Sequence, residues 1–193
     1  MLSSLEYPYI SQFHSLRHLS QINEDYRKEL KTNTSFTDED INKQLAIVGS
    51  NFHPGFSKNP IQLWEMIQGH EKFLYPETRE WNKNKFTLIL FFKQEDYPDG
   101  VGEDSLVSLD DLPPAEKNFL QEQDRDGIIV KHVPVNRSNP TWQVNIVLWN
   151  DPDPLVRTIF PGIYAPPLPN PQRQTKTEFM ESKRFWDAHA FIT

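Results

Sequence analysis

Three of the six histidines of this chain are the candidates for acid–base chemistry, because an imidazole exchanges a proton near neutral pH. His53 lies in the segment Asn-Phe-His-Pro-Gly-Phe between two expected helices, where proline and glycine stiffen the loop. His132 comes at the end of an expected strand, and His189 lies in the aromatic C-terminal segment. Each also has a structural explanation, since a buried imidazole often only binds a carbonyl oxygen. We take the three as candidate catalytic residues.

Two carboxylates, Asp151 and Asp153, directly follow the third expected strand in the segment Asn-Asp-Pro-Asp-Pro. They could orient His132 or offer oxygen ligands to Mg²⁺ or Ca²⁺. They also suit a turn, because aspartate before proline favours one. If the two strands concerned are antiparallel neighbours, His132 and the carboxylates lie at opposite ends of the ladder; they meet only if a strand intervenes or the pair is parallel. Asp151 and Asp153 are therefore candidate binding residues, and a divalent metal is the cofactor left open.

A run of proline and aromatic residues near the C-terminus is the strongest local signal. Seven prolines fall between residues 152 and 171, with Ile, Phe and Tyr threaded among them. A disordered linker would be poor in such apolar residues, so we expect an ordered wall over a core that serves as a binding surface. Tyr164 in this run and Trp186 after it are candidate binding residues. The motif Ala-Pro-Pro-Leu-Pro at residues 165–169 resembles WW-domain ligands, and packing against the chain's own helices explains it as well.

Several function classes are excluded by what the sequence lacks. It has no cysteine, which removes thiol catalysis and cysteine-bound zinc. It has no phosphate-binding glycine loop, dinucleotide fingerprint, hydrolase nucleophile elbow or His-Glu-x-x-His motif. The net charge of −7 argues against a binder of duplex nucleic acid. The N-terminus lacks the features of a secretory signal, and the longest apolar run, residues 86–92, is too short to cross a bilayer. We expect a soluble cytoplasmic protein.

The N-terminal third has the patterns of helices. Apolar residues recur at three- and four-residue steps over residues 13–30, which places them on one stripe of a long helix. Thr37 and Asp40 form a capping-box variant that opens a second helix. The Asn-Pro pair at residues 59–60 opens a third. Further helices are expected at residues 113–120 and 176–191.

After residue 81 the apolar period changes to that of strands. Residues 86–92 are apolar on both faces, as in a central strand, and the strands expected at 127–133 and 142–148 could form a wide hairpin across residues 134–140. Helices followed by strands predict an α+β fold, a mainly antiparallel sheet with N-terminal helices and a C-terminal helix packed on it. Because no linker divides the chain, we expect residues 1–193 to form a single globular domain.

The C-terminal third has the form of a family signature. The residues concerned are Phe-Pro-Gly-Ile-Tyr-Ala-Pro-Pro-Leu-Pro at 160–169 and Phe-Trp-Asp-Ala-His at 185–189. They are similar to bacterial proteins classed as domains of unknown function. The resemblance covers that third alone and assigns no role to any residue.

Two functions of different classes follow. The first, which we favour, is an interaction domain that uses the Pro/aromatic C-terminal surface to bind a protein partner or a small molecule. A homodimer is a further alternative if the aromatic tail is not covered. The second is a small hydrolase-type enzyme with acid–base or metal-assisted chemistry at His53, His132 and His189 with Asp151 or Asp153. Convergence of two imidazoles and a carboxylate would favour the enzyme.

Overall fold

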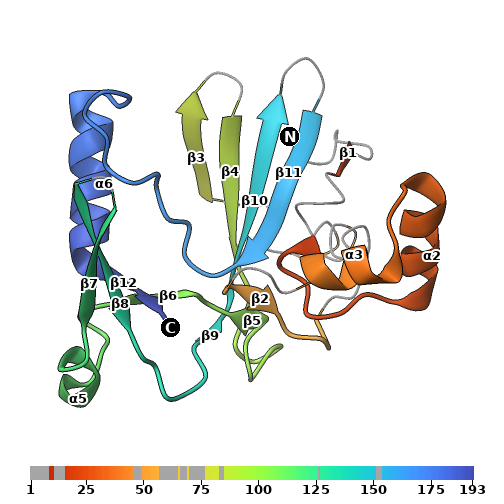
Figure 1. Ribbon diagram of the computed structural model, residues 1–193, viewed down its shortest axis with the longest axis horizontal. Helices are drawn as coiled ribbons and strands as arrows, with labels where there is room; N and C mark the ends of the chain where they lie inside the picture. Colours follow the sequence, from red (N-terminus) through yellow and green to blue (C-terminus); the bar gives the residue numbers. More distant parts are fainter. Residues whose placement is uncertain are drawn as a thin grey trace. The chain divides into compact units, whose positions relative to one another are not determined.

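The computed structural model describes residues 9–10, 16–45, 49–56, 65, 69, 77–82, 85–125, 127–150 and 154–193. The chain divides into two compact units, which are described separately (Figure 1). Unit 1 consists of Met1–Asp104 and Pro140–Gly162, and unit 2 consists of Ser105–Asn139 and Ile163–Thr193. The chain therefore passes between the units three times. The expected single domain stays a prediction, because this division does not show whether the units fold separately.

The larger sheet of unit 1 has the strand order β1 (Tyr9–Ile10), β11 (Pro154–Pro161), β10 (Gln143–Asn150), β4 (Lys85–Phe91) and β3 (Glu77–Asn82). Neighbouring strands are antiparallel, except that β1 pairs with β11 in parallel. The strands expected near residues 86–92 and 142–148 are thus confirmed as β4 and β10. The first part of the proline-rich run is not a wall over the core but the strand β11, whose Val156 and Ile159 are buried within the core.

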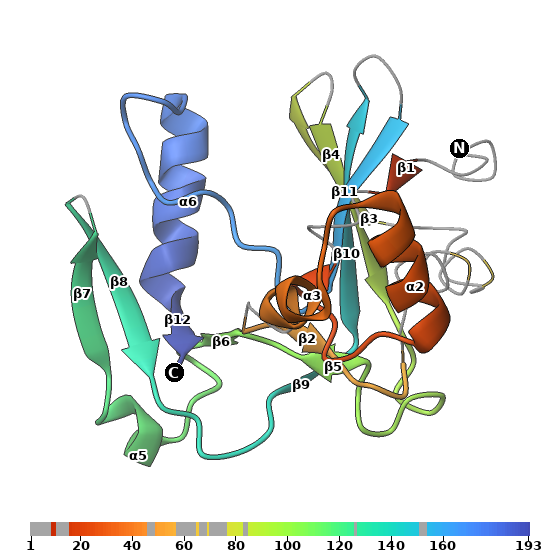
Figure 2. The same cartoon turned by 45° about the vertical axis from the view of Figure 1, so that its right-hand side comes forward.

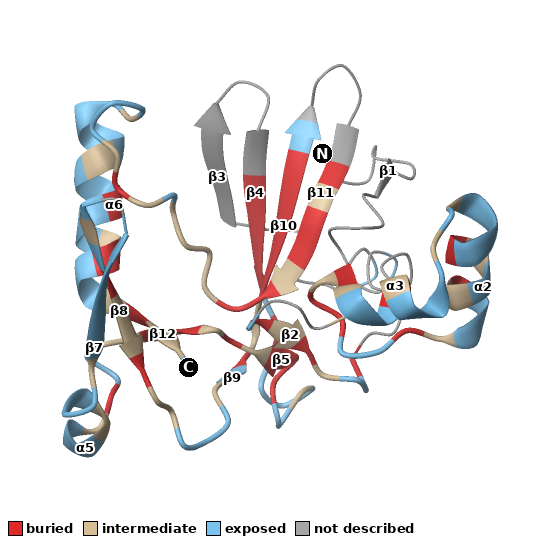
Figure 3. Cartoon of the chain, in the orientation of Figure 1, coloured by how far each residue is buried: buried red, intermediate tan, exposed pale blue. Residues whose placement is uncertain are grey.

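Alternate residues of the central strands form the apolar core of unit 1. The register places Ile146 of β10 between Leu88 of β4 and Ile159 of β11, and all three side chains are buried (Figure 3). Burying an aliphatic side chain of this size stabilises a fold by about 1.5–3 kcal/mol. The same cluster takes in residues from well outside the sheet, among them Leu16, Tyr26, Leu30, Ile41, Phe52, Phe56 and Val101.

Two helices and a small sheet complete the described part of unit 1. The helices are α2 (Glu24–Asn33) and α3 (Asp38–Gln44). The small antiparallel sheet has the order β2 (Asn51–Phe52), β5 (Gly102–Glu103) and β9 (Pro140–Thr141). β5 ends next to the point where the chain first leaves unit 1, and β9 begins at the point where the chain returns to it.

From Leu16 to Leu30, the described part of the apolar stripe expected over residues 13–30 is buried, but the long helix expected from it is wrong. Leu19 forms an isolated parallel bridge with Phe52, so the backbone is not helical there. The helix begins only at Glu24, because Asn23 acts as its N-cap and accepts a hydrogen bond from the Tyr26 amide at 2.9 Å. The three- and four-residue spacing therefore marks burial in an irregular segment as well as in a helix.

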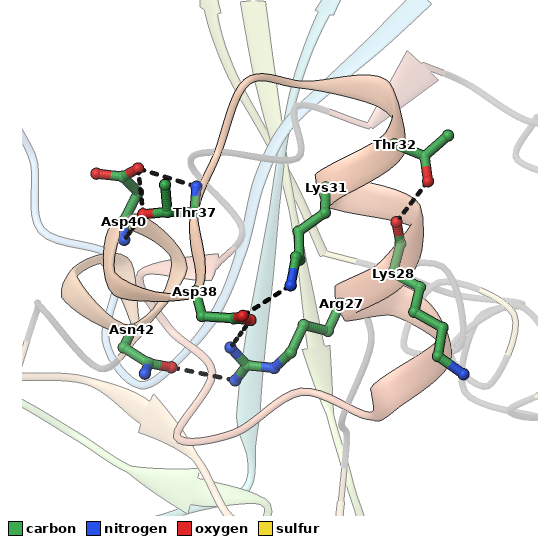
Figure 4. A network of polar contacts seen from close by, with 8 residues as sticks. All are labelled: Arg27, Lys28, Lys31, Thr32, Thr37, Asp38, Asp40 and Asn42. Carbon is green, nitrogen blue, oxygen red and sulfur yellow. Dashed lines mark hydrogen bonds and ion pairs between the residues drawn. The ribbon is translucent and has the colours of Figure 1, made fainter.

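The capping box expected at Thr37 is confirmed at the start of α3. The Thr37 hydroxyl accepts from the Asp40 amide, and the Asp40 carboxylate accepts from the Thr37 amide. The next residue, Asp38, joins α3 to α2: it accepts hydrogen bonds from Lys31 at 2.7 Å and Arg27 at 3.2 Å (Figure 4). These two donors, Lys31 first, hold the pKa of Asp38 below its ordinary value. Of the helix expected to begin at residues 59–60, Glu65 and Gly69 are described and helical, and the rest lies outside the described residues.

The sheet of unit 2 has the order β6 (Leu106–Ser108), β12 (His189–Ile192), β8 (Ile128–Val133) and β7 (Gln121–Arg125). β12 pairs with β6 in antiparallel and with β8 in parallel. Two helices belong to this unit, α5 (Pro114–Lys117) and α6 (Lys176–Ala188), and α6 runs directly into β12 (Figure 2). The buried apolar cluster is small and consists of Val107, Leu112, Val133 and Ala190.

Two expectations for unit 2 are wrong. The strands β8 and β10 do not form a hairpin, because β8 belongs to the sheet of unit 2 and β10 to that of unit 1. The last helix ends at Ala188 rather than near residue 191, since His189–Ile192 pair as a strand between β6 and β8. The short helix expected near residues 113–120 is confirmed as α5.

The α+β class is confirmed. The described residues form helices and mostly antiparallel sheets, with the strands distributed over three sheets rather than one. The N-terminal helices belong to unit 1 and the C-terminal helix to unit 2. Within the ranges that the structure describes, every helix is too short or too polar to span a membrane.

Candidate functional site

Two of the three candidate histidines, His132 and His189, lie in one group of aromatic rings in unit 2. The ring of His132 stacks on Phe191 with centroids 5.6 Å apart, and Phe191 lies 5.2 Å from Trp186. Trp186 meets Phe185 edge-on at 5.3 Å, and Phe185 stacks on His189 at 4.0 Å with the planes 8° apart. We call these five residues the C-terminal ring cluster.

The local fold explains why the five rings meet. The parallel pairing of β8 and β12 places Phe191 opposite His132. His189 precedes Phe191 by two residues on β12, and side chains two apart on a strand point to the same face. α6 ends where β12 begins, so its last turn brings Phe185 and Trp186 to the same rings. The consecutive elements α6 and β12 and the distant strand β8 thus supply one site.

His189 has a defined structural role at the C-terminal end of α6. The last four carbonyl groups of a helix lack partners within it. Here His189 Nδ1–H donates to the Phe185 carbonyl at 2.8 Å, and Lys131 Nζ donates to the carbonyls of Trp186 at 3.1 Å and Asp187 at 2.9 Å. The Leu109 amide donates to the fourth, that of Ala188, at 2.8 Å. Since Nδ1 carries the proton, the Nε2 of a neutral His189 is an acceptor.

His132 lacks such a partner. Its Nε2 is buried and makes no hydrogen bond with any residue that the structure describes. Leaving a buried polar atom unsatisfied costs about 1–3 kcal/mol. The ring is retained beside Phe191 despite this cost, and its unused nitrogen is the one polar feature at that edge of the cluster.

Trp186 links the ring cluster to the second half of the proline-rich run. Its indole Nε1–H donates to the carbonyl oxygen of Pro166 at 3.1 Å. Pro166 belongs to residues 163–170, which form no helix or strand and which we call the strap. The strap contains the candidate binding residue Tyr164, which is half-buried. Trp186 itself is buried, whereas the other four rings of the cluster are partly exposed.

The third candidate, His53, lies in unit 1 and is paired with a carboxylate. Its Nε2 is 3.0 Å from Glu103 Oε1, and the two side chains are 29% and 36% exposed. The β2–β5 pairing brings the two together, because Asn51 and Glu103 are register partners and His53 directly follows β2. The His53 amide also donates to the Val101 carbonyl at 3.0 Å. Such a pair can position an imidazole for proton transfer.

Sequence reasoning did not find Glu103 as the partner of His53. The two are fifty positions apart, and nothing in the local pattern around either residue marks the other. The candidates Asp151 and Asp153 lie outside the described residues, so the structure does not place them beside His132 or elsewhere. Among the residues that are described, no three His, Asp or Glu side chains are grouped so as to hold a metal ion.

Comparison of the chain with protein-family models, with curated proteins and with solved structures gives no match. The resemblance of the C-terminal third to bacterial domains of unknown function therefore stays a prediction.

Proposed function

We propose that this chain is an interaction domain that binds a protein partner through the C-terminal ring cluster of unit 2 and the adjoining strap. The observation that carries the proposal is the ring cluster itself: five rings in continuous contact, four of them still partly exposed. Aromatic residues dominate the centres of protein interfaces because they bury a large area with few rotatable bonds.

The polar groups of the cluster fit the same purpose. His189 offers an acceptor nitrogen at its edge, and His132 holds a nitrogen that the described part of the protein leaves unused. A binding surface needs a few placed polar groups in an apolar setting to fix the orientation of its ligand.

Site-specific photo-crosslinking tests this proposal. A benzophenone side chain at Phe185, inside the ring cluster, is expected to give a discrete adduct with a partner in cells that express the full chain. The matched control places the same group at Phe91 in unit 1, an aromatic residue that is 48% exposed. The adduct should also disappear when His132 is changed to Ala. Equal labelling at Phe185 and Phe91, or none at Phe185, would contradict the proposal.

A second function is favoured by one specific observation, the His53–Glu103 pair in unit 1. We propose as the alternative a small hydrolase-type enzyme in which Glu103 orients His53 and the imidazole acts as general base. The matched variants are His53→Gln and Glu103→Gln. If a hydrolysis of esters or phosphate esters is found, both substitutions should reduce kcat, by about 10²-fold or more for His53→Gln. If His53→Gln and Glu103→Gln both leave the hydrolysis rate unchanged, this alternative is wrong.

A further inference from the structure

The strap has the composition and burial pattern of a polyproline II segment. Pro166, Pro167 and Pro169 each fix their own φ near −65° and keep the preceding residue extended. A polyproline II helix has three residues per turn, so residues three apart share a face. Pro169 is buried and Pro166 half-buried, whereas Pro167 between them is exposed. The strap therefore has the Pro-x-x-Pro arrangement, with both outer prolines facing inward.

One face of α6 holds this segment. The Trp186 indole donates to the Pro166 carbonyl, and the backbone carbonyls of polyproline II have no partners of their own. One turn earlier on the same face, the Ser182 hydroxyl is 3.1 Å from Gln174 Nε2, which belongs to the turn that follows the strap. Ser182 is 2% exposed, and its small side chain allows the chain to pass close to the helix.

We propose that the Ser182–Trp186 face of α6 is a receptor for polyproline II ligands, which the strap occupies within the same chain, and that a Pro-x-x-Pro segment of a partner takes the place of the strap. The inference rests on the proposed function in that it names the ligand class of the same surface. Recognition of proline-rich segments by an aromatic groove with a hydrogen-bond donor is a recurring mode of peptide binding. Here the chain supplies both the receptor face and an example of its ligand.

The tethered strap has a large advantage over a free peptide. A segment joined to its receptor by a short connection acts at an effective concentration in the millimolar range. A separate peptide therefore binds only when the strap is loosened. The hydrogen bonds from Trp186 to Pro166 and from Gln174 to Ser182, together with the two inward prolines, are among the contacts that hold the strap in place.

The test uses the full chain labelled with 5-fluorotryptophan, because Trp186 is the only tryptophan of unit 2 and Trp186→Phe assigns its ¹⁹F resonance. The probe is a synthetic peptide of residues 163–171. In the double variant Pro166→Gly/Pro169→Gly we expect the peptide to shift the Trp186 resonance saturably. The wild-type chain should bind it about tenfold more weakly or worse. The control peptide carries alanine in place of both inward prolines and should have no effect.

A folded double variant whose Trp186 resonance moves from its wild-type position but does not respond to the peptide would overturn the inference. So would a Trp186 resonance that is unchanged by the double substitution, because the prolines would then not hold the strap. If the double variant fails to fold, Gln174→Ala loosens the strap with the prolines intact and is judged by the same two outcomes. If the peptide binds but no partner is cross-linked at Phe185, the proposed function fails while this inference stands. If a partner is cross-linked but the peptide does not bind, this inference fails while the proposed function stands.

Discussion

In unit 1, His18 donates from Nδ1 to the Ser50 carbonyl and His53 is paired with Glu103, whereas in unit 2 His132 keeps a buried nitrogen without a hydrogen bond in the part of the chain that is described. The apolar cores of the two units also differ in size. Among the described residues, seventeen form the buried cluster of unit 1 and four form that of unit 2. Unit 2 therefore depends more on single polar contacts, such as those of Lys131 and Trp186.

This difference bears on the proposed receptor. A large apolar core stabilises unit 1. A small core stabilises unit 2 less, and a region with little buried apolar area opens locally at lower free energy. Exchange of the strap for an external ligand requires such an opening, so the proposed receptor lies in the unit that is better suited to it.

Two glycines give the largest expected contrast between the units. Gly162 of unit 1 has φ +99°, and a Cβ there would lie 2.5 Å from the carboxylate of the buried Asp104. Gly162→Ala should therefore reduce the free energy of unfolding by about 3 kcal/mol, from backbone strain and overpacking together. Gly127 of unit 2 has φ +80° but nothing within 4 Å of its Cβ position. Gly127→Ala should cost only the strain, about 1–2 kcal/mol. If urea unfolding shows that both variants lose the same free energy of unfolding, the Asp104 side chain moves away from the added methyl group without cost.

The two cores can be compared by making the same substitution at one fully buried valine in each. Val144→Ala in unit 1 should reduce the free energy of unfolding by about 2–3 kcal/mol, and Val133→Ala in unit 2 by about 2 kcal/mol, because the smaller cluster collapses more easily around a cavity. Thermal unfolding followed by the ¹⁹F resonance of Trp186 reports unit 2 directly. If Val144→Ala lowers the Trp186 transition as much as Val133→Ala does, the units unfold together and the contrast between them is one of local packing only.

The cap of α6 can be broken by changing Lys131 to Met. This removes two charge-assisted hydrogen bonds to the helix carbonyls and should destabilise unit 2 by about 1–2 kcal/mol. The matched control is Lys183→Met, which removes an exposed pair with Asp187 on the same helix and should cost about 0.3–0.5 kcal/mol. Hydrogen exchange of the last turn of α6 measures both. If the last turn of α6 is equally protected from exchange in Lys131→Met and Lys183→Met, the hydrogen bonds of Lys131 do not stabilise unit 2.

The smallest expected effect concerns pH and the α2–α3 network of unit 1. The pKa of Asp38 is lowered by hydrogen bonds from Lys31 and Arg27, so the unfolded chain binds its proton more readily than the folded one. The contribution of the Asp38 carboxylate to the free energy of unfolding is thus present at neutral pH and lost as pH falls below about 4. Asp38→Asn should be slightly less stable than the wild type at pH 7, with the difference closing in acid unfolding curves. In a Lys31→Met background, Asp38→Asn should reduce the stability at pH 7 by a smaller amount. If the reduction is the same as in the wild type, the hydrogen bond from Lys31 does not stabilise the folded chain.

The parts of the fold that the sequence predicted are those encoded locally. The Thr37–Asp40 capping box, the apolar run of β4 and the alternating pattern of β10 each depend on neighbouring residues, and the cap and both strands are confirmed. The break before α2 was also locally encoded, since Asn23 is followed by two acidic residues in the first turn. It was missed because the apolar spacing continues through the break.

The parts that the sequence could not predict depend on pairing between distant segments. Nothing near Pro134–Pro140 indicates that the strand before it and the strand after it join different sheets. The His53–Glu103 pair and the position of β12 between β6 and β8 have the same origin, because both are set by the register of strands far apart in sequence. For the candidate site, the residue types were identified from the sequence, but the meeting of His132, Phe191 and Trp186 was not.

The central place of β12 in its sheet has a consequence for how the chain is made. β6 has no neighbour among the described strands except β12, which is about 80 residues further along. At about 5–20 residues per second, a ribosome needs roughly 4–16 s to cover that interval. From the synthesis of each strand until β12 is made, the inner edges of β6 and β8 and the apolar side chains of Val107 and Val133 lack their partner strand. Nascent chains of this protein should therefore recruit chaperones until β12 emerges.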